Sequence, residues 1–124
     1  MHKLYLDTNF LLIPGQFKVD IFSEIKRILE ENVEICILEE TISELHKIIE
    51  TANIKDRYAA KLALQLTKHL KTEPSSFDNV DDRLVALAKQ GDYVATQDGA
   101  LKRRLKEKKV RIITLKQKSH LEFG

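Results

Sequence analysis

The stretch Val80–Asp98 concentrates residues that could do chemistry. Asp81 and Asp82 stand at the head of a run of apolar residues that recur every three or four positions, a spacing typical of a helix. The strand-like run Tyr93–Thr96 follows, and Asp98 lies just beyond it in an Asp-Gly turn signal. The pattern therefore predicts a helix and a buried strand that both present carboxylates near their ends.

A further carboxylate, Asp7, directly follows the short apolar run Leu4–Leu6, which has the pattern of a central parallel strand buried on both faces. In a parallel α/β layout the carboxyl ends of the strands open onto one crevice, so we expect Asp7, Asp82 and Asp98 to converge there. Unpaired carboxylates at one point repel one another unless they share protons or bind a cation. Because only oxygen ligands are available, the expected cation is Mg²⁺ or Mn²⁺.

Asp7 also has a purely structural interpretation, as a helix cap or a turn residue. Thr8 or Asn9 could cap the next segment from a less buried place. A carboxylate at the end of a buried strand is costly unless it has a partner, and this position favours the functional interpretation.

Three glutamates, Glu39, Glu40 and Glu44, lie on the helix predicted after the second strand, Val33–Leu38. At 3.6 residues per turn, Glu44 lies about 120° from the centre of the apolar stripe of that helix. Such a boundary position lets a side chain reach a cleft or point to water. Spacing alone does not choose among the three glutamates.

The predicted elements follow the order β-α-α-β-α-α-(β)-α-β-α-β, with the bracketed short strand inside the loop Thr72–Val80. This order predicts an α/β fold with a mostly parallel sheet of four or five strands and helices on both faces. The winding direction is expected to switch between the strands that end at Asp7 and Thr96. Pro14-Gly15 is expected to stop a short helix, and the tail Lys116–Gly124 shows no clear periodicity.

The composition suits one domain that spans residues 1–124, with a basic helix and a last strand and tail at 101–124. No apolar run approaches the roughly 18 residues that a membrane-spanning helix needs. The start leads directly into a strand, so we expect a soluble cytoplasmic protein without a membrane partner. Cys36 is the single cysteine, which excludes an intrachain disulfide and a Cys-rich zinc site.

The net charge of +2 conceals an asymmetry along the chain. Nine basic residues and one acid between Leu101 and Lys118 give that segment a charge of +8, so the remainder carries −6. A basic end beside an acidic body indicates a surface for a polyanion next to a site for cations. The alternative is a helix face that is merely solvated. The candidate phosphate contacts are Lys102, Arg103, Arg104 and Lys106.

Four short motifs occur together and in order. They are Leu6-Asp7-Thr8-Asn9, Ser43-Glu44-Leu45, Val80-Asp81-Asp82-Arg83-Leu84 and Ala95-Thr96-Gln97-Asp98. Together they resemble the four acidic motifs of the PIN-domain nucleases, and the match runs from Leu4 to about Leu115. Within that family, DTNFLLIPGQFKVDIF, TQDGALKRRL and KQKSHLE resemble archaeal relatives of the PIN endonuclease that processes small-subunit ribosomal RNA.

The resemblance implies a three-layer α/β/α sandwich and an endoribonuclease that uses one or two Mg²⁺ or Mn²⁺ ions. The metal-binding and catalytic residues that it implies are Asp7, Glu44, Asp82 and Asp98. Asn9 and Thr96 are the implied polar helpers, and Asp81 is the implied cap or outer partner of Asp82. The implied substrate is single-stranded RNA, an rRNA precursor for the subgroup, cut to a 5′-phosphate and a 3′-hydroxyl. A second copy of the chain or ribosome-assembly proteins are further candidate partners.

Three other interpretations stay open. A VapC-type toxin would share the fold and the chemistry, but it would cut transfer or ribosomal RNA and be silenced by an antitoxin. A non-catalytic PIN module would bind RNA or protein without cutting, although the retained acids argue against it. A phosphohydrolase that forms an aspartyl-phosphate usually has Asp-x-Asp after its first strand, whereas Asn9 occupies the second position here.

Overall fold

Six strands form one sheet in the computed structural model, which describes residues 1–124. Their order is β3-β2-β1-β4-β5-β6, and every neighbouring pair is parallel except β5 and β6. The strands are β1 (Lys3–Leu6), β2 (Glu34–Leu38), β3 (Lys71–Glu73), β4 (Tyr93–Ala95), β5 (Arg111–Lys116) and β6 (His120–Phe123). The chain winds from β1 first toward β3 and later toward β5, so the predicted switch between β1 and β4 is confirmed.

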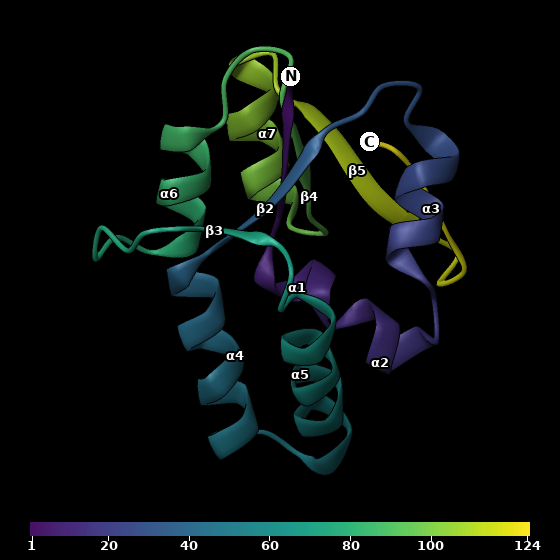
Figure 1. Cartoon of the computed structure of the whole chain (residues 1–124), viewed down its shortest axis with the longest axis vertical. Coiled ribbons are helices and arrows are strands. Elements are labelled where there is room, and N and C mark those ends of the chain that lie inside the picture. Colours follow the sequence, from purple (N-terminus) through teal and green to yellow (C-terminus); the bar gives the residue numbers. More distant parts are fainter.

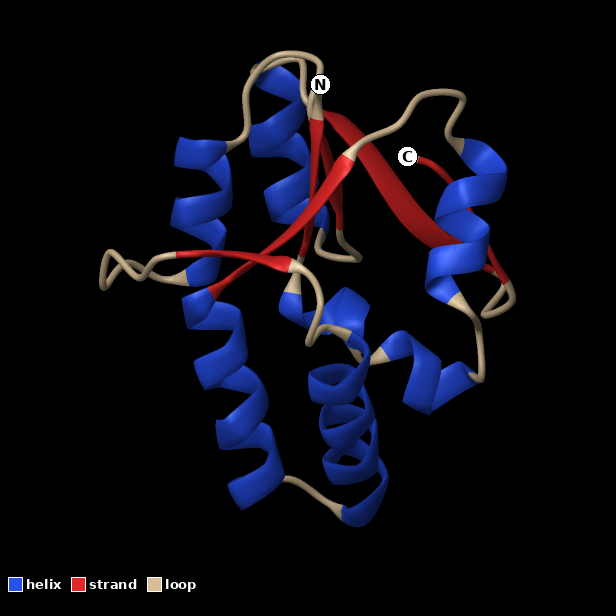
Figure 2. Ribbon diagram, in the orientation of Figure 1, coloured by secondary structure: helices blue, strands red, loops and turns tan.

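The chain forms seven helices. They are α1 (Thr8–Leu11), α2 (Ile13–Phe17), α3 (Ile21–Ile28), α4 (Glu39–Thr51), α5 (Ile54–Leu66), α6 (Val80–Leu87) and α7 (Gly99–Glu107). In Figures 1 and 2, α6 and α7 lie on one side of the sheet and α3 lies on the other. The buried side chains of α1 to α5 belong to the core on one face of the sheet, and those of α6 and α7 belong to the core on the other. The predicted three-layer sandwich is therefore confirmed. None of these helices combines the length and apolar character needed to cross a bilayer.

The central strand β1 is buried on both faces, as its sequence predicts. Leu4 and Leu6 are fully buried in the core beneath α1 to α5, whereas Tyr5 lies in the core beneath α6 and α7. Alternate side chains of a strand point to opposite faces, so one apolar run serves both cores. The strand then delivers Asp7 to the carboxyl edge of the sheet, where α4 and α5 pack side by side beyond the strand ends (Figure 1).

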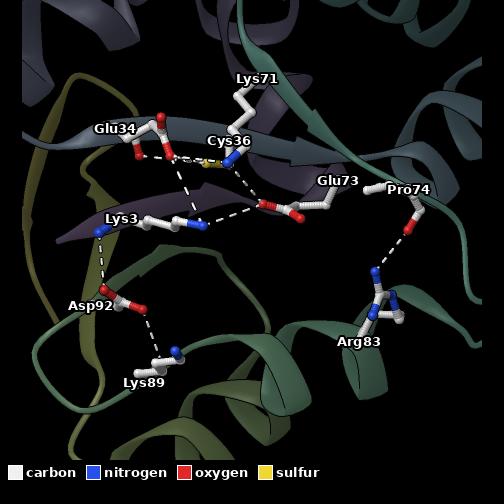
Figure 3. Close-up of polar contacts among 9 residues, drawn as sticks. All are labelled: Lys3, Glu34, Cys36, Lys71, Glu73, Pro74, Arg83, Lys89 and Asp92. Atoms are coloured by element: carbon white, nitrogen blue, oxygen red, sulfur yellow. Dashed lines mark hydrogen bonds and ion pairs between the residues drawn. The ribbon is translucent and has the colours of Figure 1, made fainter. Parts of the chain in front are cut away.

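The short edge strand β3 is confirmed where the sequence places one, and charged side chains surround it. Lys3 Nζ lies 3.5 Å from Glu73 Oε1, and Lys71 Nζ lies 3.5 Å from Glu34 Oε1. Figure 3 shows these four side chains meeting across β1, β2 and β3. Charged residues of this kind discourage another chain from pairing with an exposed strand edge.

The C-terminal tail contains a strand that the sequence does not signal, so the sheet has six strands where four or five are predicted. β6 pairs antiparallel with β5, with Lys116 opposite His120. The turn between them contains Gln117 at φ 54° and Lys118 at φ 55°. Positive φ favours Gly or Asn, and because neither is present the usual hairpin signal is missing.

Pro14-Gly15 does not stop a helix, contrary to the prediction. Pro14 occupies the first turn of α2, where its missing N–H costs nothing. Gly15 is required there by packing, because a Cβ at this position would lie 2.5 Å from the Cα of Ala59 in α5. The Pro-Gly pair thus starts a helix and lets it approach its neighbour closely.

We expect Gly15→Ala to destabilise the protein by about 1–3 kcal/mol, the usual cost of overpacking against atoms that cannot move. Gly99→Ala is the matched control, because a Cβ there meets only Arg103 Nη1 at 3.8 Å. Urea unfolding of both variants measures the difference. Equal stability of the two variants would show that α2 and α5 are not in close contact.

Candidate active site

One cavity of about 700 Å³ opens at the carboxyl edge of β1 and β4. Residues from α1, α4, α6 and α7 form its walls, together with those that follow β1 and β4. The predicted site residues that line it are Asp7, Asn9, Glu44, Asp81, Asp82, Asp98 and Arg104. Residues from four separate motifs therefore meet in one place, as expected from the parallel sheet.

Asp7 is the most buried acid of this cavity, with 4% of its surface exposed. Burial raises its pKa to about 6, and the charges of Asp81 and Glu44 act in the same direction, against hydrogen bonds from Thr96 and Thr8 that lower it. Asp7 also caps α1, because its Oδ1 accepts from the Thr8 backbone N–H at 2.8 Å. The structural and functional interpretations of Asp7 are therefore compatible, and neither Thr8 nor Asn9 is the cap.

Thr96 joins Asp7 to Asp98. Its buried hydroxyl donates to Asp7 Oδ2 at 2.6 Å and accepts from the Asp98 backbone N–H at 3.1 Å. Asp98 itself caps α7, because its Oδ1 accepts from the Leu101 N–H at 2.9 Å. Asn9 Oδ1 accepts weakly from the Gln97 N–H at 3.4 Å. The loops after β1 and β4 are thus held together by short polar side chains.

The structure distinguishes the three helix glutamates, among which sequence spacing does not choose. Glu44 lines the cavity and accepts a hydrogen bond from the Thr8 hydroxyl. Glu39 and Glu40 instead accept from backbone N–H groups in the loop before α6, those of Ser75 and Ser76. Glu44 is therefore the glutamate that can act in the cavity.

Arg83 completes the anchoring of that loop. Its Nε lies 3.2 Å from Glu40 Oε2, and its Nη2 donates to the Pro74 carbonyl at 2.8 Å (Figure 3 shows the second contact). Both side chains of the ion pair are largely buried. This contact fixes the start of α6, and with it the direction of the adjacent acids.

Asp81 and Asp82 are held differently. Asp82 Oδ1 lies 3.0 Å from Arg104 Nη1, and its Oδ2 accepts from Asn79 Nδ2 at 3.0 Å. Asp81 is half-buried, and burial together with the charge of Asp98 raises its pKa. Asp81 therefore lies in the electrostatic field of Asp7 and Asp98, whereas Asp82 forms an exposed ion pair with Arg104 at the rim.

The four predicted basic residues diverge around α7. Arg104 lines the acid cavity, whereas Lys102 Nζ reaches Thr114 Oγ1 in β5 at 2.9 Å. Arg103 and Lys106 are exposed. Of these four residues, Arg104 is the one that lines the cavity.

Sequence reasoning missed several residues of the cavity wall. Lys47, Ile48 and Thr51 line it beside Glu44. Their spacing of three, four and seven residues from Glu44 marks one helix face, so periodicity could have found them. Asn79 also lines the wall, and it caps α6 by accepting from the Asp82 N–H at 2.8 Å.

Comparison with known proteins agrees with this geometry. A family model described as a PIN-like domain matches residues 4–118. The chain belongs to the PIN-like domain family. The resemblance of the four motifs to those of PIN-domain nucleases is thus confirmed.

Individual relatives refine the placement within the family. The PIN-like domain is 32% identical over 129 residues to Ribonuclease VapC4 of Methanocaldococcus jannaschii, covering 100% of this chain and 98% of the relative. The chain is therefore a homologue of a VapC-type ribonuclease.

Two solved structures share its fold. The structure of the PIN domain endonuclease Utp24 superposes with a TM-score of 0.74 at 22% identity, covering 98% of this chain and 90% of the other. A domain of a functionally unknown protein from M. jannaschii superposes with a TM-score of 0.54 at 18% identity, covering 94% and 92%.

The donors of this PIN-like domain suit a hard divalent cation, because the cavity offers carboxylate oxygens and no Cys or His. No three of these side chains lie close enough together to form a ready-made cage. Mg²⁺ keeps several of its waters and usually binds one or two carboxylates directly. A roomy cavity with acidic walls fits such a hydrated ion.

We expect the pH dependence of stability to reveal Asp7. Its folded pKa of about 6 lies above the ordinary value of 3.8, so the folded state binds more protons in that window. Stability should therefore fall as pH rises from about 4 to 6, by at most about 3 kcal/mol from this group. Asp7→Asn, which keeps a cap oxygen, removes this loss.

Thermal melts in EDTA from pH 4 to 7 measure the effect. The melting temperature of Asp7→Asn minus that of wild type should increase as pH rises through that window. Above the window this difference should stay constant. A difference between the two proteins that does not change with pH would show that the pKa of Asp7 is not raised.

Proposed function

We propose that this protein is a divalent-metal-dependent endoribonuclease of the VapC type that cuts single-stranded RNA. The observation that carries the proposal is the meeting of Asp7, Glu44, Asp81 and Asp98 in one cavity of a PIN-like domain. The 32% sequence identity to Ribonuclease VapC4, over an alignment that covers the whole chain, supports RNA as the substrate.

In this proposal Asp7, Asp98, Glu44 and Asp81 hold one or two Mg²⁺ or Mn²⁺ ions. A metal held there would lower the pKa of the attacking water and offset negative charge in the transition state. Thr96 positions two of these carboxylates, because it contacts the side chain of Asp7 and the backbone of Asp98. The products are a 5′-phosphate and a 3′-hydroxyl, as the family resemblance implies.

Asp81 takes the place that the motif comparison assigns to Asp82. Asp82 is engaged by Asn79 and Arg104, so its charge is already compensated. We propose that Asp82 orients Arg104 toward the cavity, where the guanidinium can contact the phosphate being cut. Lys102, Arg103 and Lys106 would contact RNA phosphates outside the cavity, which gives affinity with little sequence preference.

The toxin interpretation is favoured over ribosomal RNA processing. The relative at 32% identity is a VapC-type ribonuclease, whereas the similarity to Utp24 at 22% identity concerns the fold. We therefore propose an antitoxin protein as the partner that silences the enzyme in the cytoplasm.

Cleavage of total cellular RNA in Mg²⁺ or Mn²⁺, with mapping of the cut ends, tests the activity. Asp7→Asn, Asp81→Asn and Asp98→Asn should each slow cleavage on the order of 100-fold or more, because each removes charge aimed at the reacting centre. Asp82→Asn should slow it by only about tenfold, as expected for a residue that acts through another.

Glu30→Gln is the matched control, since this exposed acid lies outside the cavity and should leave the rate unchanged. Mn²⁺ should also raise the melting temperature of wild type but not of Asp7→Asn/Asp98→Asn, a readout that does not depend on cleavage. Loss of activity in Asp82→Asn with full activity in Asp81→Asn would reverse the assignment of the two acids.

We expect induced expression of the wild-type chain in a heterologous host to arrest growth, because an unsilenced toxin ribonuclease destroys RNA needed for translation. Asp7→Asn expressed to the same level should permit growth. Normal growth with active, soluble wild-type enzyme would exclude the toxin role and leave the ribonuclease proposal intact.

A further inference from the structure

The charge of the residues changes sign along the carboxyl edge of the sheet. The neighbouring parallel strands β1, β4 and β5 all end at this edge. Asp7 follows β1, Asp98 lies just beyond β4, and Lys116 ends β5. A basic residue, Lys116, therefore lies at the same edge of the sheet, one strand farther from β1 than the acids.

Lys102 is tied to this basic position by hydrogen bonds. Its Nζ donates to Thr114 Oγ1 at 2.9 Å, and Thr114 Oγ1 donates to Gln97 Oε1 at 2.7 Å. Gln97 Oε1 also accepts from the Leu115 N–H at 2.6 Å. Gln97 lies between Thr96 and Asp98, so the Lys102 ammonium is fixed beside the rim of the acid cavity.

Lys106 and Lys116 lie near Lys102. Lys106 is four residues farther along α7, and Lys116 is on the same face of β5 as Thr114, the residue that Lys102 contacts. Burial lowers the pKa of Lys102, and the charges of Lys116 and Lys106 lower it further, while Asp98 opposes them. None of the three lysines forms an ion pair with a carboxylate. Three uncompensated cations in one place repel one another, and an anionic ligand would relieve that repulsion.

We propose that Lys102, Lys106 and Lys116 form a binding site for the phosphodiester backbone of single-stranded RNA that leaves the acid cavity across β5. The inference rests on the proposed function, because it concerns the substrate of the same site. It adds β5 to the RNA path and separates this lysine site from Arg104, which faces the cavity.

Nucleic acid fits this surface better than an acidic protein segment does. Protein interfaces usually centre on exposed apolar or aromatic anchors. The exposed large apolar residues of this protein are Met1, Ile54, Tyr58, Leu66, Phe77 and Phe123, and none lies on α7 or β5. Lysines on elements that carry no exposed large apolar side chain suit contacts to phosphate that ignore base sequence.

The test compares Lys102→Gln/Lys106→Gln/Lys116→Gln with a control of equal charge change, Lys55→Gln/Lys61→Gln/Lys68→Gln. The control lysines are exposed, form no ion pair and lie on or just after α5. Fluorescein-labelled oligouridylate is titrated in EDTA at several salt concentrations. Each lost phosphate contact should reduce the slope of log K against log salt by about 0.7, hence by about 2 for the triple variant.

Lys116→Gln alone provides a second variant, which should reduce the slope by about 0.7 although it lies outside the basic helix. The control should keep the wild-type slope. Overlapping curves for the lysine-site variant and the control would overturn the proposal. So would weaker binding to polyglutamate with unchanged binding to RNA, which would assign the site to a protein partner.

The binding and cleavage measurements distinguish failure of the nuclease proposal from failure of the lysine site. Asp7→Asn/Asp98→Asn should keep most of the wild-type salt slope, since binding is measured without metal. A reduced slope in the lysine-site variant supports the site even if wild type cuts no RNA. Wild-type cleavage with an unchanged slope in that variant would overturn the lysine site and leave the nuclease proposal standing.

Discussion

The arrangement of this molecule depends on one hydrogen-bonded carboxylate, Asp7, at the end of the central strand. A buried carboxylate is costly in free energy unless its oxygens find donors. Thr8 supplies a backbone N–H from the start of α1, and Thr96 supplies a hydroxyl from the end of β4. Because these donors come from segments far apart in sequence, the pairing of β1 with β4 is what makes the site.

The same side chains serve both the fold and the site. Asp7 caps α1 and Asp98 caps α7, so each orients its helix while it presents a carboxylate to the cavity. Helix N-termini carry partial positive charge, which favours carboxylates gathered beside them. Asp92 shows the contrasting case of a buried acid with a structural use only, since it accepts from the backbone N–H groups of Lys3 and Lys89 away from the cavity (Figure 3).

The separation of acidic and basic side chains gives the proposed reaction a spatial order. Carboxylates gather after β1 and β4, where a cation would be held, and the uncompensated lysines gather around β5. Arg104 lines the acid cavity and is paired with Asp82. The family shared with Ribonuclease VapC4 and the fold shared with Utp24 are compatible with this arrangement. A shared fold does not by itself fix the substrate, because one fold supports many functions.

The sequence by itself determined the fold class, the central strand, the switch between β1 and β4 and the acids that meet there. These follow from periodicity and from the rule that parallel strands end at one edge. Tertiary structure alone showed how the surroundings of Asp81 and Asp82 differ: Asp82 contacts Arg104 and Asn79, whereas Asp81 is half-buried near Asp98. It also showed that Glu39 and Glu40 anchor a loop, that Pro14-Gly15 begins a helix against Ala59, and that the tail forms β6. The glutamate contacts and the packing of Gly15 depend on partners distant in sequence, which a local sequence pattern cannot reveal. β6 depends on a turn with positive φ at Gln117 and Lys118, and these residue types do not signal such a turn.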